Sequence, residues 1–98
     1  MASKIPNNQK SHLELLHAIQ LAASDTVLLD KFLADILTPQ EYREIKKRWQ
    51  IITQLHAGMT QREIAYNLHI GIGTVTRGSR VIQNKRGGSR EVLALIKK

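Results

Sequence analysis

Apolar side chains recur along this chain at intervals of three and four residues, which is the spacing of one face of an α-helix. No stretch shows the strict alternation of apolar and polar residues that marks a half-buried strand. Signals for the start of a helix divide the pattern into segments, and an apolar stripe follows each of them. The sequence therefore predicts an all-α protein of about six helices.

Three segments begin with a capping box, in which a cap hydroxyl and a glutamate three residues later each accept a hydrogen bond from the other's backbone N–H group. The pairs are Ser11 with Glu14, Thr38 with Glu41, and Thr60 with Glu63. The first pair predicts a helix over about 12–23. The second predicts a long helix that starts with Pro39 and ends near Gly58. The apolar stripe of this long helix consists of Tyr42, Ile45, Trp49, Ile52 and Leu55.

Two further helices have single cap residues. Asp25 is expected to cap a second helix with a wide apolar face, and Ser89 a last helix after the loop Gly87–Gly88. The polar residues 1–10 are expected to form a flexible arm, and 11–98 a single helical domain. Because one short chain cannot bury all of these apolar faces, we expect two chains to interlock as a homodimer.

The segment at about 60–83 has the spacing of a helix-turn-helix. Such a motif needs a small residue where its two helices cross, an apolar residue at the end of the first, and a branched residue pointing back from the second. Those requirements are met by Ala65, Leu68 and Val75, with Ile64 and Ile70 filling the crossing. His69 stands at the turn, where the backbone is expected to be left-handed. An ordinary helical hairpin is the alternative interpretation.

The second helix of this motif is expected to enter the major groove of DNA with its N-terminal residues at the base edges. Glycines there allow close approach of the backbone, and threonines offer a hydroxyl and a methyl group to the bases. The start of the first motif helix can hold phosphates. The candidate DNA contacts are Gln61, Arg62, Gly71, Ile72, Gly73, Thr74, Thr76 and Arg80. Each of them could instead be a solvated polar position.

The charge distribution favours a polyanionic partner. The chain carries 15 Lys and Arg against eight Asp and Glu, a net charge of +7. Residues 61–98 hold eight of the basic and only two of the acidic side chains, and no acid occurs from Ile64 to Arg90. A basic block that coincides with a helix-turn-helix indicates double-stranded DNA as the partner.

Several stretches together resemble the Trp repressor family. They are Leu37-Thr38-Pro39, Arg48 in the long helix, Gly58, and the segments TQREIA and GIGTVTRGS, in that order. The resemblance covers roughly Leu33 to Ile82, and the run from Thr74 to Ser79 is highly specific. It implies a six-helix, intertwined homodimer that binds a palindromic operator when its corepressor, L-tryptophan, is bound.

The resemblance also implies a tryptophan site and revises one interpretation. Helix geometry alone turns Arg77 toward DNA, whereas the matching family position grips the carboxylate of tryptophan and stacks on its indole ring. Arg48 matches a residue that covers the other face of the ring. Leu37 and Thr38 match pocket residues supplied by the partner subunit, and Gly78 a small residue that leaves room for the ring.

This chain departs from the family pattern at four places. Val81 stands where the family has a hydroxyl near the amino group of the ligand. Arg80 replaces a neutral polar residue, which should strengthen contact with phosphate. Ala65 replaces a lysine that often contacts DNA, and the link from Gly58 to Gln61 is one residue shorter than in the best-known members.

Other classes of function find little support in the residues. The chain has no cysteine, and none of its four histidines forms an i, i+4 pair, so we expect no metal site. The sequence has neither the clustered carboxylates of a nuclease nor a glycine-rich phosphate-binding loop, so nothing in it indicates an enzyme. Without an apolar run of membrane-spanning length or a secretory signal, a cytoplasmic, nucleoid-associated protein is expected. Two rivals remain: a transposition-associated DNA-targeting module without a tryptophan effector, and an adaptor whose basic helix binds an acidic protein.

Overall fold

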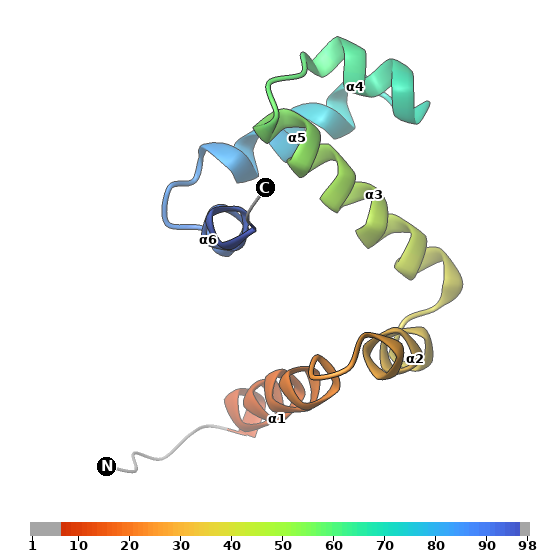
Figure 1. Ribbon diagram of the computed structural model, residues 1–98, viewed down its shortest axis with the longest axis vertical. Coiled ribbons are helices and arrows are strands. Elements are labelled where there is room, and N and C mark those ends of the chain that lie inside the picture. Colours follow the sequence, from red (N-terminus) through yellow and green to blue (C-terminus); the bar gives the residue numbers. More distant parts are fainter. Residues whose placement is uncertain (1–6, 97–98) are drawn as a thin grey trace. The chain divides into compact units, whose positions relative to one another are not determined.

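The computed structural model describes residues 7–96, and side chains from Gln9 onward. Over this range the chain forms helices joined by short links, with no strand, which confirms the all-α prediction (Figure 1). The helices are α1 (Asn7–Ala22), α2 (Thr26–Ile36), α3 (Pro39–His56), α4 (Gln61–Leu68), α5 (Ile72–Gln83) and α6 (Gly88–Leu95). No helix within this range has the length and apolar character needed to cross a membrane.

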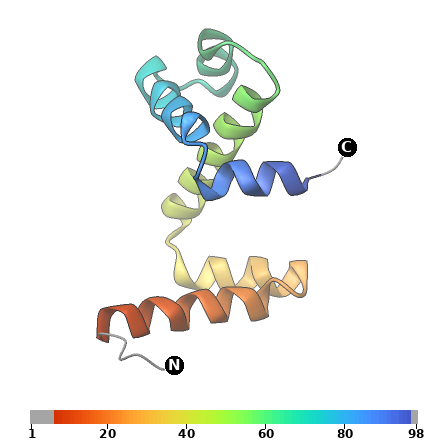
Figure 2. The same cartoon turned by 90° about the vertical axis from the view of Figure 1, so that its left-hand side faces the viewer.

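The chain forms two compact units, Met1–Tyr42 and Arg43–Lys98. In the first unit, α1 and α2 pack against each other, and both views show them side by side (Figure 2). Asp25 caps α2 as predicted, because its carboxylate accepts a hydrogen bond of 3.1 Å from the N–H group of Val27. The expectation of one helical domain over 11–98 stays a prediction.

The predicted start of the first helix is wrong. Helix α1 begins at Asn7, so Ser11 lies inside it and cannot form a capping box with Glu14. Nothing in the polar run from Asn7 to Lys10 breaks a helix, so the helix continues through a local signal that would otherwise start one. These four residues of the predicted arm are thus helical, and residues 1–6 lie outside the described range.

The capping box at the start of α3 forms as predicted. The N–H group of Thr38 donates to Glu41 Oε1 over 2.9 Å, and the N–H group of Glu41 donates to Thr38 Oγ1 over 3.1 Å. One residue later, the Tyr42 hydroxyl donates to Asp30 Oδ1 over 2.7 Å and so ties the first turn of α3 to α2. This hydrogen bond to a carboxylate raises the pKa of Tyr42.

The second unit is built on a small core where α3, α4 and α5 meet. Ile51, Ile64 and Val75, one from each helix, are almost fully buried. The half-buried residues around them include the predicted crossing residues, which confirms the helix-turn-helix. Those packed against the core are Leu55, Met59, Ala65, Leu68 and Ile70.

The turns around this motif also follow the prediction. Gly58 ends α3 with φ 97°, a left-handed conformation that glycine adopts without steric cost. Thr60 and Glu63 form the predicted capping box at the start of α4. His69 ends α4 in the left-handed region, with φ 56° and ψ 48°. This turn aims α5 across α4 and sets the angle of the motif.

Two details of the helix faces differ from the prediction. Ile51, absent from the predicted stripe of α3, is buried beside Ile52, whereas Ile45 on that stripe is exposed. The packing of α4 and α5 against α3 buries a face of α3 that its own pattern of apolar residues does not predict. Ser89 does not cap α6, because the helix begins at Gly88 with Gly87 as its cap residue. The N–H group of Gly87 donates to the carbonyl oxygen of Asn84 in the turn that precedes the helix, so this turn leads into α6 one residue before Ser89.

Candidate functional site

The exposed start of α5 brings together four of the predicted DNA contacts. Gly71 is the cap residue, and Ile72, Gly73 and Thr74 form the first turn, all of them exposed. A β-carbon at Gly71 or Gly73 would meet no atom within 4 Å, so the space over this backbone is open. A duplex can approach such a surface without displacing any part of the protein.

The predicted contacts Thr76 and Gln61 touch each other. The Thr76 hydroxyl lies 2.8 Å from Gln61 Oε1 and 3.0 Å from the carbonyl oxygen of Ile72, which are both acceptors. This contact joins the second turn of α5 to the first turn of α4. With its oxygen turned to Thr76, Gln61 keeps its NH₂ group free to donate elsewhere.

The charges around the motif are almost all positive. Arg62 in the first turn of α4 and Arg80 in the last turn of α5 are exposed. The acid of this region, Glu63, is engaged in the capping box. Its carboxylate accepts from the N–H group and the hydroxyl of Thr60, and these hydrogen bonds lower the pKa of Glu63.

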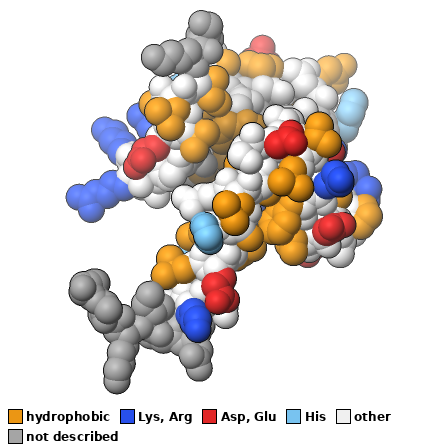
Figure 3. Space-filling model, turned by 60° about the horizontal axis from the view of Figure 1, so that its bottom comes forward, with side chains coloured by type: hydrophobic (Ala, Val, Ile, Leu, Met, Phe, Trp, Pro, Cys, Tyr) orange, Lys and Arg blue, Asp and Glu red, His pale blue; other side chains and the backbone are white. Residues whose placement is uncertain are grey.

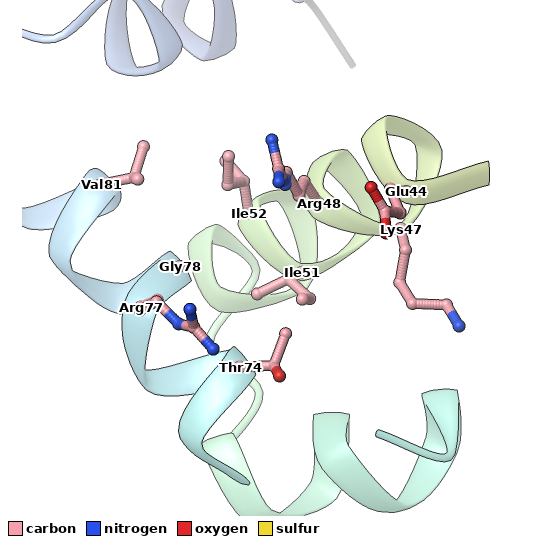
Figure 4. A pocket seen from close by; sticks show the side chains of 9 residues that line it. All are labelled: Glu44, Lys47, Arg48, Ile51, Ile52, Thr74, Arg77, Gly78 and Val81. Carbon is pink, nitrogen blue, oxygen red and sulfur yellow. The ribbon is translucent and has the colours of Figure 1, made fainter. Parts of the chain in front are cut away.

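A pocket of about 430 Å³ opens between α3 and α5, within the size range of small-molecule sites. Arg48 of α3 and Arg77 and Gly78 of α5, three of the residues predicted for tryptophan, line it together (Figure 4). The lining between the two arginines is apolar, because Ile51 of α3 lies between them, and Ile52 lies beside Arg48. Cationic planar side chains over an apolar floor suit a flat ring that carries a carboxylate.

Gly78 has a packing role in this pocket. A β-carbon at this residue would lie 2.5 Å from Ile51 Cγ2, which no real contact between carbon atoms allows. The glycine therefore lets α5 approach α3. The resemblance gave Gly78 the role of leaving room for a ring, and that role stays a prediction.

The sequence reasoning missed several lining residues. Besides Val81, noted as a departure from the family, they are Glu44, Lys47, Ile51, Ile52 and Thr74. Glu44, Ile51 and Ile52 lie three or four residues from Arg48, so the helical spacing around Arg48 was a signal that could have found them. Lys47 directly precedes Arg48, and this spacing does not indicate it. Thr74 was predicted as a DNA contact and lines the pocket as well.

Leu37 and Thr38, the other residues predicted for tryptophan, lie in the unit Met1–Tyr42, whereas the pocket belongs to the unit Arg43–Lys98. Leu37 follows the last residue of α2, and Thr38 caps α3 with its hydroxyl. Their expected contribution from a partner subunit stays a prediction. In the described part of the chain, no three His, Asp or Glu side chains gather in a way that could hold a metal ion.

The chain is similar to known proteins along most of its length. The family model described as Trp repressor protein matches residues 10–96. A Trp operon repressor homolog of Photobacterium profundum is 34% identical over 88 residues, covering 88% of this chain and 82% of the relative. One of Mannheimia succiniciproducens is 34% identical over 80 residues, 81% of this chain and 78% of the relative. One of Vibrio parahaemolyticus is 32% identical over 68 residues, 68% of this chain and 66% of the relative.

Proposed function

This chain belongs to the Trp repressor family, and we propose that it is a DNA-binding transcriptional repressor whose affinity for its operator depends on L-tryptophan. The observation that carries the proposal is the pocket between α3 and α5. A ligand seated there touches Arg48 on one helix and Arg77 on the other. Thr74, in the same wall, belongs to the exposed first turn of α5, so the ligand and the DNA would act on one helix.

The ligand part of the proposal rests on the two arginines. A guanidinium group forms paired hydrogen bonds with a carboxylate, and its plane stacks on an aromatic face. In the proposed complex Arg77 holds the carboxylate of tryptophan and Arg48 covers the indole ring. The corepressor then fixes the angle of α5, and it shifts the equilibrium only by its preference for the DNA-competent state.

The DNA part rests on the open first turn of α5. In the proposed complex this turn lies in the major groove, and Arg62 and Arg80 contact phosphates. The operator is a palindrome, because a symmetric dimer reads two half-sites about one helical turn apart. Contacts to phosphate release counterions, so affinity falls steeply as salt rises.

The dimer part rests on apolar surface that this chain leaves uncovered (Figure 3). In the unit of α1 and α2, Leu16 is 43% exposed, Leu28 46% and Leu21 62%. Apolar exposure of this extent on two packed helices is typical of an interface rather than of a solvated surface. We assign it to a second copy of the chain, which also supplies Leu37 and Thr38 to the pocket.

The test is operator binding with and without the ligand. DNA selected from a random pool by the full-length protein at saturating L-tryptophan provides the operator, and a scrambled duplex provides the control. We expect tryptophan to tighten binding to the operator but not to the scrambled duplex, and operator to tighten tryptophan binding by the same factor. Arg48→Ala should lose this response and keep non-specific DNA binding. Equal binding of both duplexes under all conditions would reject the repressor.

Val81 supports a second candidate, a helix-turn-helix regulator of the same family without a tryptophan effector. This side chain lines the pocket and is 40% exposed, yet it offers no polar atom to an amino group. The same experiment separates the two candidates. Specific operator binding of unchanged affinity at saturating tryptophan would favour the second.

A further inference from the structure

A side chain of α6 fastens the C-terminal end of α5. Arg90, in the first turn of α6, donates from Nη1 to the carbonyl oxygen of Ile82 over 3.0 Å. Ile82 belongs to the last turn of α5, whose carbonyl groups have no partner within the helix. The turn 84–87 separates the two helices, and Figure 2 shows α6 leaving it in a direction different from that of α5. The hydrogen bond therefore ties together two helices that diverge.

The guanidinium group suits this position for two reasons. The helix dipole stabilises a positive charge near the C-terminus of a helix, and a hydrogen bond from such a charge to a carbonyl oxygen is charge-assisted. Within the described residues, Arg90 has no acidic partner that would compete for it. The side chains of its neighbours Lys85 and Arg86 make no hydrogen bond or ion pair in this part of the chain. The contact is therefore particular to Arg90 and not shared by the basic turn.

Helix α5 is held at its centre and at this end. At its centre, Val75 lies in the core and Gly78 packs against Ile51. The first turn is open, because Gly71 caps the helix without a side-chain hydrogen bond and the space over Gly73 is free. Arg90 thus fixes the end of α5 that is opposite to the one expected to meet DNA.

The fastened end of α5 also carries one end of the pocket. Val81 directly precedes Ile82 and lines the pocket opposite α3 (Figure 4). The pocket and the hydrogen bond of Arg90 occur in the same arrangement of helices. A helix moves as a stiff rod, so a shift of its last turn changes both the distance of Val81 from α3 and the direction of the first turn. Releasing Arg90 therefore affects both ends of α5.

We propose that Arg90 is a positioning residue, which holds α5 at the angle at which the pocket accepts its ligand and the first turn reaches DNA. This inference rests on the proposed function, because it assumes that one angle of α5 serves both partners. Protein without either partner populates this angle in part, and Arg90 raises that population. Since an apparent affinity is reduced by the fraction of protein in the competent state, loss of Arg90 weakens the binding of each partner taken alone.

The test is operator binding by Arg90→Met with and without saturating L-tryptophan. Methionine keeps an unbranched side chain but removes the charge and the donors. Without tryptophan, we expect operator affinity to fall about five-fold, the effect of one hydrogen bond at an exposed site. With tryptophan the loss should be smaller, because the ligand restores the population that the substitution removes. The response to tryptophan should therefore be larger than in wild type. Arg90→Lys keeps the charge and a donor, so its response should lie between the two.

Arg86→Met is the matched control, since it removes an exposed cation of the turn 84–87 but no side-chain hydrogen bond. Any loss of operator affinity that it causes should be the same with and without tryptophan. Hydrogen exchange gives a second readout. In Arg90→Met the amide of Asn84, which donates to the carbonyl of Val81 at the end of α5, should exchange faster, whereas the amide of Ile64 in α4 should not. A fold that is merely destabilised would expose both amides.

Three outcomes would overturn the role of Arg90 while the tryptophan-dependent repressor stands. They are an unchanged operator affinity in Arg90→Met, an equal loss with and without tryptophan, and faster exchange at both amides. A wild-type protein whose operator affinity does not respond to tryptophan would instead overturn the proposed function, and this inference with it.

Discussion

Ile51 of α3 lies against the bare backbone of Gly78 in α5, so closely that a β-carbon at residue 78 would come within 2.5 Å of Ile51 Cγ2. Ile51 belongs to the core of the helix-turn-helix and also lines the pocket. One contact therefore connects the stability of the helix-turn-helix with the shape of the pocket. The branched side chain of isoleucine has little freedom in a helix, so it cannot rotate away.

Gly78→Ala should consequently destabilise the protein. Alanine favours a helix over glycine by about 1 kcal/mol, but overpacking a core costs about 1–3 kcal/mol. We expect a net loss of roughly 1 kcal/mol in the free energy of unfolding, measured by urea denaturation. Ile51→Leu removes the γ2 methyl group, so the double variant should recover part of this loss. A Gly78→Ala protein more stable than wild type would refute the close contact.

The sequence predicts the local features of this fold well. The caps at Asp25, Thr38 and Thr60 and the left-handed turn at His69 each depend on a few neighbouring residues, and the structure has them where expected. Ser11 is the counterexample. A serine with a glutamate three residues later also occurs inside helices. Only the conformation of the residues before the serine distinguishes a helix start from a position inside a helix.

The pocket was predictable only in part. Arg48 and Arg77 are 29 positions apart in the sequence, and the resemblance to a family placed them in one site before any geometry was known. Helical spacing alone turned Arg77 toward DNA. The burial of Ile51 depends on how α3 crosses α5, and neither helix encodes that crossing by itself.

The contact between Thr76 and Gln61 should stabilise the motif. Thr76→Val keeps the shape of the side chain and removes the hydroxyl, and Gln61→Ala removes the acceptor. Each change should lower the free energy of unfolding by about 1 kcal/mol, the net value of one such hydrogen bond. The double variant should lose less than the sum, because the two changes remove the same interaction. Fully additive losses would show that the pair does not interact in solution.

The capping box at Thr60 should make the motif sensitive to acid. The hydrogen bonds from Thr60 lower the pKa of Glu63 below its ordinary value of 4.5. The stabilisation that Glu63 provides is therefore complete above this value and is lost as the pH falls through the lower pKa of the folded state. Thr60→Ala should cost about 1 kcal/mol at neutral pH.

Denaturation of wild type and Glu63→Gln over a series of pH values checks this. The difference in the free energy of unfolding should be largest near neutral pH and should shrink as Glu63 becomes protonated. An NMR titration of the Glu63 side chain gives its pKa directly. A value at or above 4.5 would contradict the capping geometry.

The uncovered leucines of α1 and α2 predict the assembly state. Light scattering at micromolar concentration should give about twice the chain mass of 11.1 kDa. Leu16→Lys and Leu28→Lys place a charge on the apolar surface, so both should weaken the dimer and lower its melting temperature. Ser11→Lys adds the same charge at an exposed polar position of α1 that faces away from Leu16, and it should leave the dimer intact. A wild-type chain that stays folded as a monomer would contradict the interlocked assembly.

The open space above Gly73 allows a sharp test of DNA recognition. Because a β-carbon there meets no atom within 4 Å, Gly73→Asp should keep the fold while it places a negative charge where the duplex is expected. Gly88→Asp is the matched control, since Gly88 is also open and also lies in the first turn of a helix. We expect Gly73→Asp to lose operator binding by more than ten-fold and Gly88→Asp to lose far less.

Arg62→Ala should weaken operator and scrambled DNA equally and reduce the salt slope by about one, because it removes a phosphate contact. Fluorescence anisotropy over a salt series measures all three, and equal losses for the two aspartate variants would remove α5 from the DNA interface.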